Sequence, residues 1–230
     1  FSQDHLDYHK NMKKYFNAKL ILFSKLLKKK QNVITDNEIP EFLKLQKIVK
    51  KNNLNLLTIG KKKSTIQFKS VKPTDNFQNV IFKHSKKNYT VKIPLIGLFQ
   101  IKNLFMSILA IKLSDLNIKK ILHVVKNIKE VNGRLQLVKT TPNQTKVFID
   151  YAHTPAALDT ALKTLKEHYG IKPDIVFGCG GDRDKEKRSK MGNICEKNAG
   201  EIYITDDNPR NENPKSIRKM IISGFRKKLI

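Results

Sequence analysis

Two arginines in the last third of the chain lie in polar islands suited to binding an anionic or zwitterionic small molecule. Arg183 belongs to residues 178–185, Gly-Cys-Gly-Gly-Asp-Arg-Asp-Lys. An arginine between carboxylates can grip a carboxylate or phosphate through two parallel hydrogen bonds, and the glycines let a ligand approach the backbone closely. The glycines complete neither a dinucleotide fingerprint nor a phosphate-binding loop. A tight strand-to-helix turn with solvated ion pairs is therefore the alternative.

The second island, residues 205–210, ends in Asp207, Asn208, Pro209 and Arg210. A zwitterionic ligand end needs both signs of charge, a carboxylate for its ammonium group and a guanidinium for its carboxylate. Asp207 and Arg210 supply that pair. The alternative is a loop in which Asp-Asn-Pro makes only a turn.

A third island, residues 150–155, places an acid, a phenol and an imidazole close together as Asp150, Tyr151 and His153. Pro155 suits the first turn of a helix, with Thr154 as its N-cap. A capped helix with an incidental histidine is the alternative interpretation. We find no serine or cysteine nucleophile to partner His153, so a hydrolase triad is not supported.

Each island must be positioned by the short apolar run that precedes it. These runs cover residues 146–149, 174–177 and 202–204, and segments with helical periodicity, residues 156–168 and 187–199, separate them. Short buried strands alternating with helices predict a parallel sheet of βαβ units. The three islands should then lie at the carboxyl ends of strands, where open α/β sheets bind ligands.

The first half of the chain has a different pattern. We expect a helix over residues 11–30, a short strand at 33–35 and a helix over 38–50 begun by Asp36 or Asn37. Short β segments with intervening turns follow, and they suggest antiparallel hairpins at a sheet edge. Two helices, a junction at 129–133 and a further strand come next, and a helix closes the chain. The segments expected here are 56–59, 65–68, 79–82 and 89–93 as strands, 101–113 and 118–128 as helices, 134–138 as a strand and 214–228 as a helix.

Composition limits the class of protein. Hydrophobic residues make up 39% of the 230, enough for a core, and no apolar run approaches the ~20 residues of a membrane span. Cys179 and Cys195 are too few for a disulfide framework, so we expect reduced thiols and a cytoplasmic location. The formal net charge of +26 would suit nucleic acid. It comes mainly from dispersed lysines without interleaved aromatics, which favours a generally cationic, solvated surface.

Taken together, the islands resemble the Mur ligases of peptidoglycan synthesis, in particular the branch that adds meso-diaminopimelate. Matching motifs occur in the same order over nearly the whole chain. They are Asp-His-Leu-Asp-Tyr-His at 4–9, the helix start at 12–19, Gly97-x-Phe99 with Asn103, Gly133-Arg134, residues 150–155 with Ala157-Leu158, residues 177–185 with Lys187-Arg188 and Met191-Gly192, and residues 205–210. So many islands in order make coincidence very improbable.

The resemblance implies an α/β fold in two parts. Residues 1–131 would be part of a P-loop-type central ATPase domain, and residues 132–230 a truncated Rossmann-like, amino-acid-binding domain. It also implies an enzyme, an ATP-dependent acid–amino-acid ligase. We expect this enzyme to be a monomer. ATP would phosphorylate the D-Glu carboxylate of UDP-MurNAc-L-Ala-D-Glu, an amine of meso-diaminopimelate would attack the acyl phosphate, and Mg²⁺ would neutralise the phosphates.

Carried over by motif, the resemblance assigns roles to single residues. Lys19 would be carbamylated and His5 would bind a second Mg²⁺, so that both are metal ligands and catalytic residues. Asn103 and Arg134 would lie near the nucleotide, and Asp150 and His153 would line the ATP side. The amino-acid site would comprise Arg183, Asp207, Asn208, Pro209 and Arg210. Arg210 favours diaminopimelate over lysine because lysine lacks the second carboxylate, and a buried guanidinium left unpaired is costly.

Some features depart from the family. Gln100 replaces a usual Asn, Ala156 an acidic residue and Glu186 a Gly. The family's uridine-nucleotide domain and phosphate-binding loop do not precede Phe1, and a later Gly-Lys-Gly-His-Glu segment does not follow Ile230. We therefore expect this chain alone to be inactive, and ligation by it would refute that expectation. A non-catalytic remnant or a basic nucleic-acid-binding module is the alternative, although Lys19, His5, Arg183 and Arg210 are all retained.

Overall fold

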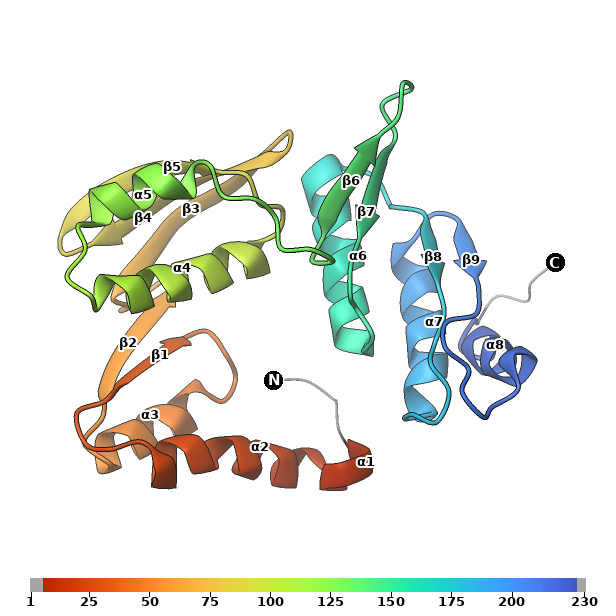
Figure 1. The fold of residues 1–230 in the computed structure, drawn as a ribbon, viewed down its shortest axis with the longest axis horizontal. Coiled ribbons are helices and arrows are strands. Elements are labelled where there is room, and N and C mark those ends of the chain that lie inside the picture. The colour runs from red at the N-terminus through yellow and green to blue at the C-terminus, as the bar shows by residue number, and fades with distance from the viewer. Residues whose placement is uncertain (1–5, 227–230) are drawn as a thin grey trace. The chain divides into compact units, whose positions relative to one another are not determined.

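The computed structural model describes residues 6–226 of the chain, and these form two compact units (Figure 1). One unit comprises residues 16–130, and the other comprises residues 131–226 with residues 6–15. The short helix α1 (Leu6–His9) is followed by α2 (Met12–Ile21), which continues into a π-helix, η1 (Leu22–Leu26). The expected helix over 11–30 is therefore too long, because Leu27 has an extended backbone and ends it.

The unit of residues 16–130 is built on one five-stranded sheet in the order β1-β2-β3-β4-β5. Strands β1 (Asn32–Asp36), β2 (Asn55–Gly60) and β3 (Ile66–Thr74) pair in parallel, and β4 (Phe77–His84) and β5 (Lys87–Ile93) continue antiparallel. The predicted strands and hairpins are thus confirmed. Strand β3 extends beyond the expected 65–68, because the residues up to Pro73 and Thr74 still belong to it.

Helices complete this unit. Helix α3 (Phe42–Lys51) begins later than expected, because Asp36 and Asn37 do not cap it. The Asp36 carboxylate accepts from the Glu38 N–H at 2.9 Å, and the Asn37 amide donates to the Lys62 carbonyl oxygen at 2.8 Å. Helices α4 (Leu98–Lys112) and α5 (Ile118–Val125) confirm the two predicted apolar helices, although α5 ends three residues early.

The core of this unit lies where α4 and α5 cover the sheet (Figure 1). Phe105 of α4 is fully buried, and its ring lies edge-on to Phe68 of β3 and Phe82 of β4, with centroids 5.0 and 4.8 Å away. A second cluster joins α2, η1 and α3 to β1 and β2 and includes Leu20, Val33 and Leu45. Helices therefore cover the parallel edge of the sheet, as such strands require.

The C-terminal unit carries the three islands, but its strands pair differently from the expected single parallel sheet. Strands β6 (Gln136–Thr140) and β7 (Lys146–Ile149) form an antiparallel pair, and β8 (Ile175–Phe177) and β9 (Ile202–Ile204) form a separate parallel pair. The strands are confirmed, whereas the expected parallel arrangement is found only for β8 and β9. A five-residue connection lets β6 fold back on β7 as a hairpin, which local contacts favour.

Helices α6 (Pro155–Tyr169), α7 (Glu186–Asn198) and α8 (Pro214–Ile222) confirm the predicted helical segments, with α8 shorter than expected. They pack against one face of β8 and β9 around Leu162, Met191 and Ile221. The other face is not buried, since Val176 and Tyr203, which are register partners, are 71% and 57% exposed. The expected buried strands are therefore buried on the helix-covered face only.

Candidate functional site

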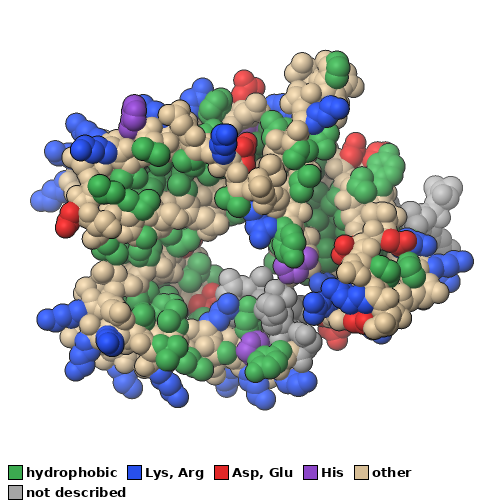
Figure 2. All heavy atoms as spheres, in the orientation of Figure 1, with side chains coloured by type: hydrophobic (Ala, Val, Ile, Leu, Met, Phe, Trp, Pro, Cys, Tyr) green, Lys and Arg blue, Asp and Glu red, His purple; other side chains and the backbone are tan. Residues whose placement is uncertain are grey.

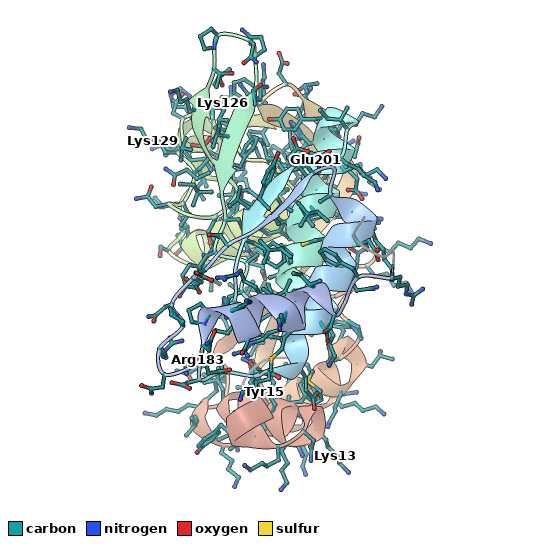
Figure 3. All side chains as sticks on the ribbon, turned by 90° about the vertical axis from the view of Figure 1, so that its right-hand side faces the viewer. Lys13, Tyr15, Lys126, Lys129, Arg183 and Glu201 are labelled. Atoms are coloured by element: carbon teal, nitrogen blue, oxygen red, sulfur yellow. The ribbon has the colours of Figure 1, made fainter. Side chains whose placement is uncertain are left out.

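Two loops at the carboxyl ends of β8 and β9 carry most of the predicted binding residues. We call residues 178–185 the glycine loop and residues 205–212 the proline loop. Because β8 and β9 are parallel and in register from Ile175 to Phe177, both loops emerge at the same edge of the sheet. In Figure 3, Arg183 on the glycine loop lies at the opposite end of this sheet from Glu201, which precedes β9.

Hydrogen bonds join the glycine loop to the proline loop along their length. The Gly181 N–H donates to the Asn208 carbonyl oxygen at 2.8 Å, and the Arg210 Nη1 donates back to the Gly181 carbonyl oxygen at 2.6 Å. Farther along, the Asn211 amide donates to the Asp182 carboxylate at 2.9 Å. The structure therefore joins the backbones of the two islands, and of the predicted binding side chains it bonds Arg210 directly to the glycine loop.

The glycines allow this close approach. A Cβ on Gly181 would lie 1.8 Å from the Pro209 carbonyl oxygen, and one on Gly178 would lie 2.5 Å from the Thr205 carbonyl oxygen. Both distances are impossible for real atoms, so only glycine fits. The sequence suggested that a ligand approaches these glycines. In the structure the approaching group at these two positions is the proline loop itself.

Arg183 and Arg210 are both solvent-exposed, as are Asp207 and Asn208. The backbone of Arg210 has a left-handed conformation, with φ of 49°, and its N–H donates to the Asn208 side-chain oxygen at 3.3 Å. Asp182, which precedes Arg183, is also left-handed, with φ of 51°. Such conformations cost free energy for residues other than glycine. The contacts between the loops hold both arginine-bearing segments in them.

An ion pair between a buried arginine and a half-buried glutamate, which sequence reasoning missed, lies beneath the two loops. Arg188 of α7 is fully buried, and its Nη1 and Nη2 each donate to one carboxylate oxygen of Glu212 at 2.8 Å. Hydrogen bonding from the guanidinium, with a further bond from the Asp182 N–H, lowers the pKa of Glu212 to about 2. The same pairing raises the pKa of Arg188. Only the short spacing from the two islands could have pointed to this pair.

The third island forms a second group with Arg134. The Asp150 carboxylate accepts from the Leu135 N–H at 2.8 Å, which ties the end of β7 to the residue before β6. The Arg134 guanidinium lies over the Tyr151 ring, 4.9 Å from its centroid, and this ring meets His153 edge-on. The Tyr151 ring thus links Arg134 with His153, close to Asp150 in the chain. One oxygen of the Asp150 carboxylate is already occupied by the Leu135 N–H.

The start of α6 confirms the predicted cap. The Thr154 hydroxyl accepts from the Ala157 N–H at 3.3 Å, and Pro155 occupies the first turn. Just before this cap, the His153 carbonyl oxygen accepts from the Lys187 ammonium at 2.9 Å. Since Lys187 lies on α7, the third island is fixed to the helix that follows the glycine loop.

The remaining predicted residues lie elsewhere in the chain. Lys19 is exposed on α2 and Asn103 is exposed on α4, both in the unit of residues 16–130. His5 lies outside the described residues. Beside Asn103, the Lys102 ammonium pairs with the carboxylates of Asp36 at 2.7 Å and Glu38 at 2.8 Å. This pairing lowers the pKa of Glu38.

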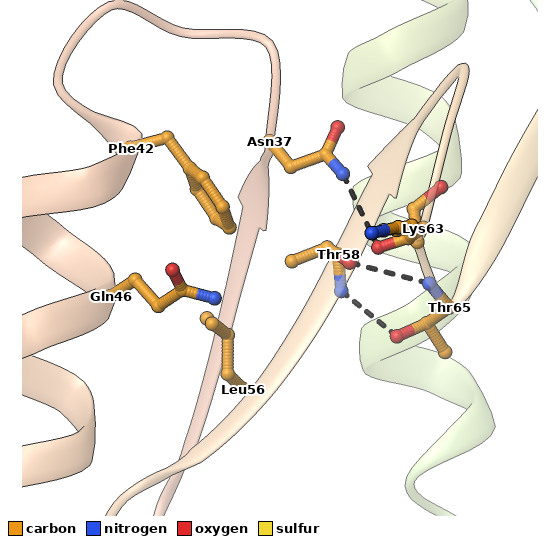
Figure 4. A pocket seen from close by; sticks show the side chains of 8 residues that line it. Asn37, Phe42, Gln46, Leu56, Thr58, Lys63 and Thr65 are labelled. Atoms are coloured by element: carbon orange, nitrogen blue, oxygen red, sulfur yellow. Dashed lines mark hydrogen bonds between the residues drawn. The ribbon is translucent and has the colours of Figure 1, made fainter.

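A pocket in the same unit contains none of the predicted site residues. It has a volume of about 600 Å³ and lies between α3 and the loop that joins β2 to β3 (Figure 4). Phe42 and Gln46 line one side, and Thr58 and Thr65, which exchange hydrogen bonds at 3.0 and 3.3 Å, line the other. Its mixed lining gives no sign of a particular ligand class.

The charge on the molecular surface is dispersed. In Figure 2, lysine and arginine side chains lie mainly around the margins of the view and do not gather into one stripe. This agrees with a generally cationic surface and gives no footprint for nucleic acid on that face. Among the described helices, none has the length and apolar character to cross a membrane.

Comparison with known proteins finds the same family over both units. Residues 1–111 match the Mur ligase middle domain, and residues 133–229 match the Mur ligase glutamate ligase domain. A UDP-N-acetylmuramoyl-L-alanyl-D-glutamate–2,6-diaminopimelate ligase of Rickettsia montanensis is 39% identical over 229 residues, which are 99% of this chain and 47% of that protein. The chain thus spans about half the length of the curated relatives it matches.

Solved structures give the same result. A UDP-N-acetylmuramoyl-L-alanyl-D-glutamate–2,6-diaminopimelate ligase superposes with a TM-score of 0.62 at 28% identity, covering 97% of this chain and 46% of that one. MurF from Acinetobacter baumannii superposes with a TM-score of 0.76 at 14% identity, covering 97% and 47%. The second likeness shows the fold alone.

Proposed function

Because the chain belongs to the Mur ligase family, we propose that it serves the ATP-dependent ligation of meso-diaminopimelate to UDP-MurNAc-L-Ala-D-Glu. In this proposal residues 1–131 are the later part of the middle domain, and residues 132–230 are the amino-acid-binding domain. The relatives at about 39% identity carry the name of that ligase. The observation that supports it best within the chain is the joining of two arginine-bearing loops at one sheet edge.

The proposed amino-acid site lies on these two loops. Diaminopimelate has two ammonium groups and two carboxylates, so its recognition requires cations and an anion at fixed spacing. Arg183 and Arg210 supply guanidinium groups for carboxylates, and Asp207 supplies a carboxylate for an ammonium group. Asn208 and Pro209 set the turn that presents Arg210. All of these side chains except the half-buried Pro209 are exposed and therefore accessible to a ligand.

Some of the residues assigned to the nucleotide have side chains that can bind a polyphosphate. Arg134 is an exposed cation stacked on Tyr151, and His153 adjoins that ring, so this group can hold a phosphate or a ribose. Asn103, on α4, is also an exposed amide. When bound, ATP supplies the phosphoryl group that activates the substrate carboxylate. Asp150 contributes chiefly by fixing the start of β6 through the Leu135 N–H.

The fit to Mg²⁺ is incomplete within the described residues. They contain no group of three or more His, Cys, Asp or Glu side chains arranged to hold a metal ion. Lys19 becomes an oxygen ligand only if it is carbamylated, and hard cations such as Mg²⁺ take several oxygen ligands. We therefore assign Lys19 as one ligand at most and derive no step through the metal. Intact mass measurement of the native chain would reveal a carbon dioxide adduct on Lys19.

Ligand binding tests the proposal without requiring turnover. Isothermal titration calorimetry of the 230-residue chain would compare meso-diaminopimelate with L-lysine. We expect diaminopimelate to bind about tenfold tighter or more, because lysine leaves one guanidinium without its carboxylate partner. Equal affinity for the two amino acids, or no binding of diaminopimelate, would contradict the assignment. A nucleic-acid-binding module would instead bind duplex DNA with an affinity that falls steeply with salt.

A further inference from the structure

The ion pair of Arg188 and Glu212 connects helix α7 with both loops of the C-terminal unit. Arg188 lies on α7, one turn beyond the glycine loop, and Glu212 is the last residue of the proline loop. Besides its two bonds to Glu212, the guanidinium donates from Nη2 to the Gly180 carbonyl oxygen at 3.1 Å. One buried side chain therefore holds both loops against α7.

Glu212 makes the matching connection in the other direction. Its Oε1 accepts from the Asp182 N–H at 2.6 Å, and its Oε2 lies 3.6 Å from the Lys185 ammonium. Asp182 directly precedes Arg183, and Glu212 follows Arg210 by two residues. The carboxylate thus fixes the backbone beside both arginines that are proposed to bind the ligand.

A gain in stability alone does not explain this ion pair well. The pairing must offset the loss of hydration of the fully buried Arg188, and apolar replacements of similar volume are often no less stable. Within the described chain, the buried Nε of Arg188 also finds no hydrogen-bond partner. A pair of this kind is better suited to fixing one arrangement of the loops among several.

We propose that Arg188 and Glu212 are positioning residues that set the spacing between the guanidinium groups of Arg183 and Arg210. That spacing selects a ligand with two separated carboxylates. Neither residue needs to touch the ligand, because each acts through the backbone of a loop. The identity of the ligand rests on the proposed function, whereas the fixing of the loops does not.

The test separates positioning from folding by comparing a single with a double substitution. Glu212→Gln leaves the Arg188 charge buried without its partner and is expected to destabilise the C-terminal unit. Arg188→Met with Glu212→Gln removes both charges, while the Gln oxygen can still accept from the Asp182 N–H. Glu186→Gln is the matched control, because Glu186 is exposed in the first turn of α7.

Two measurements are made on each chain, calorimetry with meso-diaminopimelate and amide hydrogen exchange resolved to the two loops. We expect the double variant to fold, with unchanged exchange in α6. Its loop amides should exchange about tenfold faster or more, and diaminopimelate should bind about tenfold more weakly or worse. The Glu186→Gln chain should match wild type in both.

The outcomes decide between the two proposals. A folded double variant with wild-type loop exchange and wild-type affinity would overturn the positioning role, as would faster exchange without loss of affinity. If wild type itself does not bind diaminopimelate, the proposed function fails. In that case loop exchange alone still decides whether the pair fixes the loops. If the double variant does not fold, Arg188→Lys, which keeps the charge and loses the bidentate geometry, replaces it under the same criteria.

Discussion

Arg210 donates a hydrogen bond from Nη1 to the carbonyl oxygen of Gly181 at 2.6 Å, although the two residues belong to different loops. The guanidinium has five N–H donors in a rigid fork, so one bond to the glycine loop orients the group and leaves other donors for a ligand. The Gly181 N–H is bound in turn to the Asn208 carbonyl oxygen. A change in either loop should therefore reach ligand binding through the other.

Alanine substitutions at the two adjacent glycines should have different effects. A Cβ on Gly181 would meet the backbone of Pro209 at 1.8 Å, which cannot yield without moving the proline loop. We expect Gly181→Ala to lower the free energy of unfolding by about 1–3 kcal/mol. A Cβ on Gly180 would meet only the flexible end of Arg210 at 2.9 Å, so Gly180→Ala should cost much less stability.

Urea unfolding and diaminopimelate titration of the two glycine variants would check this contrast. Gly180→Ala should weaken ligand binding more than it lowers stability, because it displaces the Arg210 guanidinium. Equal stability losses at both positions would show that the two loops are not packed as tightly as these distances require.

Arg210→Ala should reduce the use of diaminopimelate far more than the binding of ATP. Removing a charged hydrogen-bond donor costs about 1.5–3 kcal/mol, which is roughly 10- to 150-fold in affinity. Arg210→Lys should recover little, because an ammonium group cannot make the bidentate contact. Titration with diaminopimelate and with a non-hydrolysable ATP analogue would measure both effects.

The control for this prediction is Lys197→Ala, which removes an exposed cation from the last turn of α7. It should leave both affinities unchanged, since Lys197 is at the other end of that helix from the loops. Equal losses of diaminopimelate and nucleotide binding in Arg210→Ala would argue against its assigned role.

In the unit of residues 16–130, Lys102→Met should lower the free energy of unfolding, because it leaves two neighbouring carboxylates without their shared cation. Lys102 bridges Asp36 and Glu38, and its side chain is only 20% exposed. Without it the two acids repel each other, and we expect a loss of about 1 kcal/mol after allowing for solvent screening. Lys120→Met, at an exposed position on α5, is the control. Similar urea midpoints for the two variants would show that the bridge contributes nothing.

Local signals in the sequence predicted most of the elements but not how the strands of the C-terminal unit pair. The Thr154 cap with Pro155 marks the start of α6 correctly, because such caps are made within one turn. The pairing of β7 with β6 depends on contacts between strands, and apolar runs of four residues do not encode a partner. The start of α3 was predicted too early for a similar reason. Asn37, which was expected to begin the helix, instead bonds to Lys62, 25 residues away in the sequence.

The candidate site shows the same division. The three islands could be found from residue types alone, and strand ends could be expected to bring Arg183 near Arg210. The pair of Arg188 and Glu212 could not be found from residue types, because the many lysines and arginines give each of the few acidic residues several possible partners, and a separation of 24 residues carries no pairing signal. Only the burial of Arg188 distinguishes this pair from the others.

Acid should weaken the C-terminal unit through Glu212. Its pKa is lowered from 4.5 to about 2 in the folded chain, first by the bonds from Arg188. A lowered folded-state pKa means that the carboxylate stabilises the fold fully above the unfolded value. This stabilisation is lost as the pH falls from about 4.5 to about 2. Urea unfolding at pH values across this window would measure the loss of stability. Amide hydrogen exchange in α7 would locate that loss in the C-terminal unit.

Glu212→Gln should flatten this pH dependence, whereas Glu186→Gln should retain it. An unchanged slope in Glu212→Gln would mean that other carboxylates dominate the acid response of the unit. Because the comparison concerns slopes, it remains informative even if Glu212→Gln is less stable at every pH.

The two cysteines should resist alkylation in the folded chain. Both are buried, and the sulfur of Cys179, on the glycine loop, lies 3.8 Å from the sulfur of Met191 on α7. Burial raises the pKa of Cys179 and raises that of Cys195 to about 12. Since the thiolate is the reactive form, iodoacetamide at pH 8 should label neither residue until urea unfolds the unit, when both should react. Rapid labelling of Cys179 alone in the native chain would mean that the glycine loop opens away from α7, and the packing that fixes Arg183 and Arg210 would then not hold in solution.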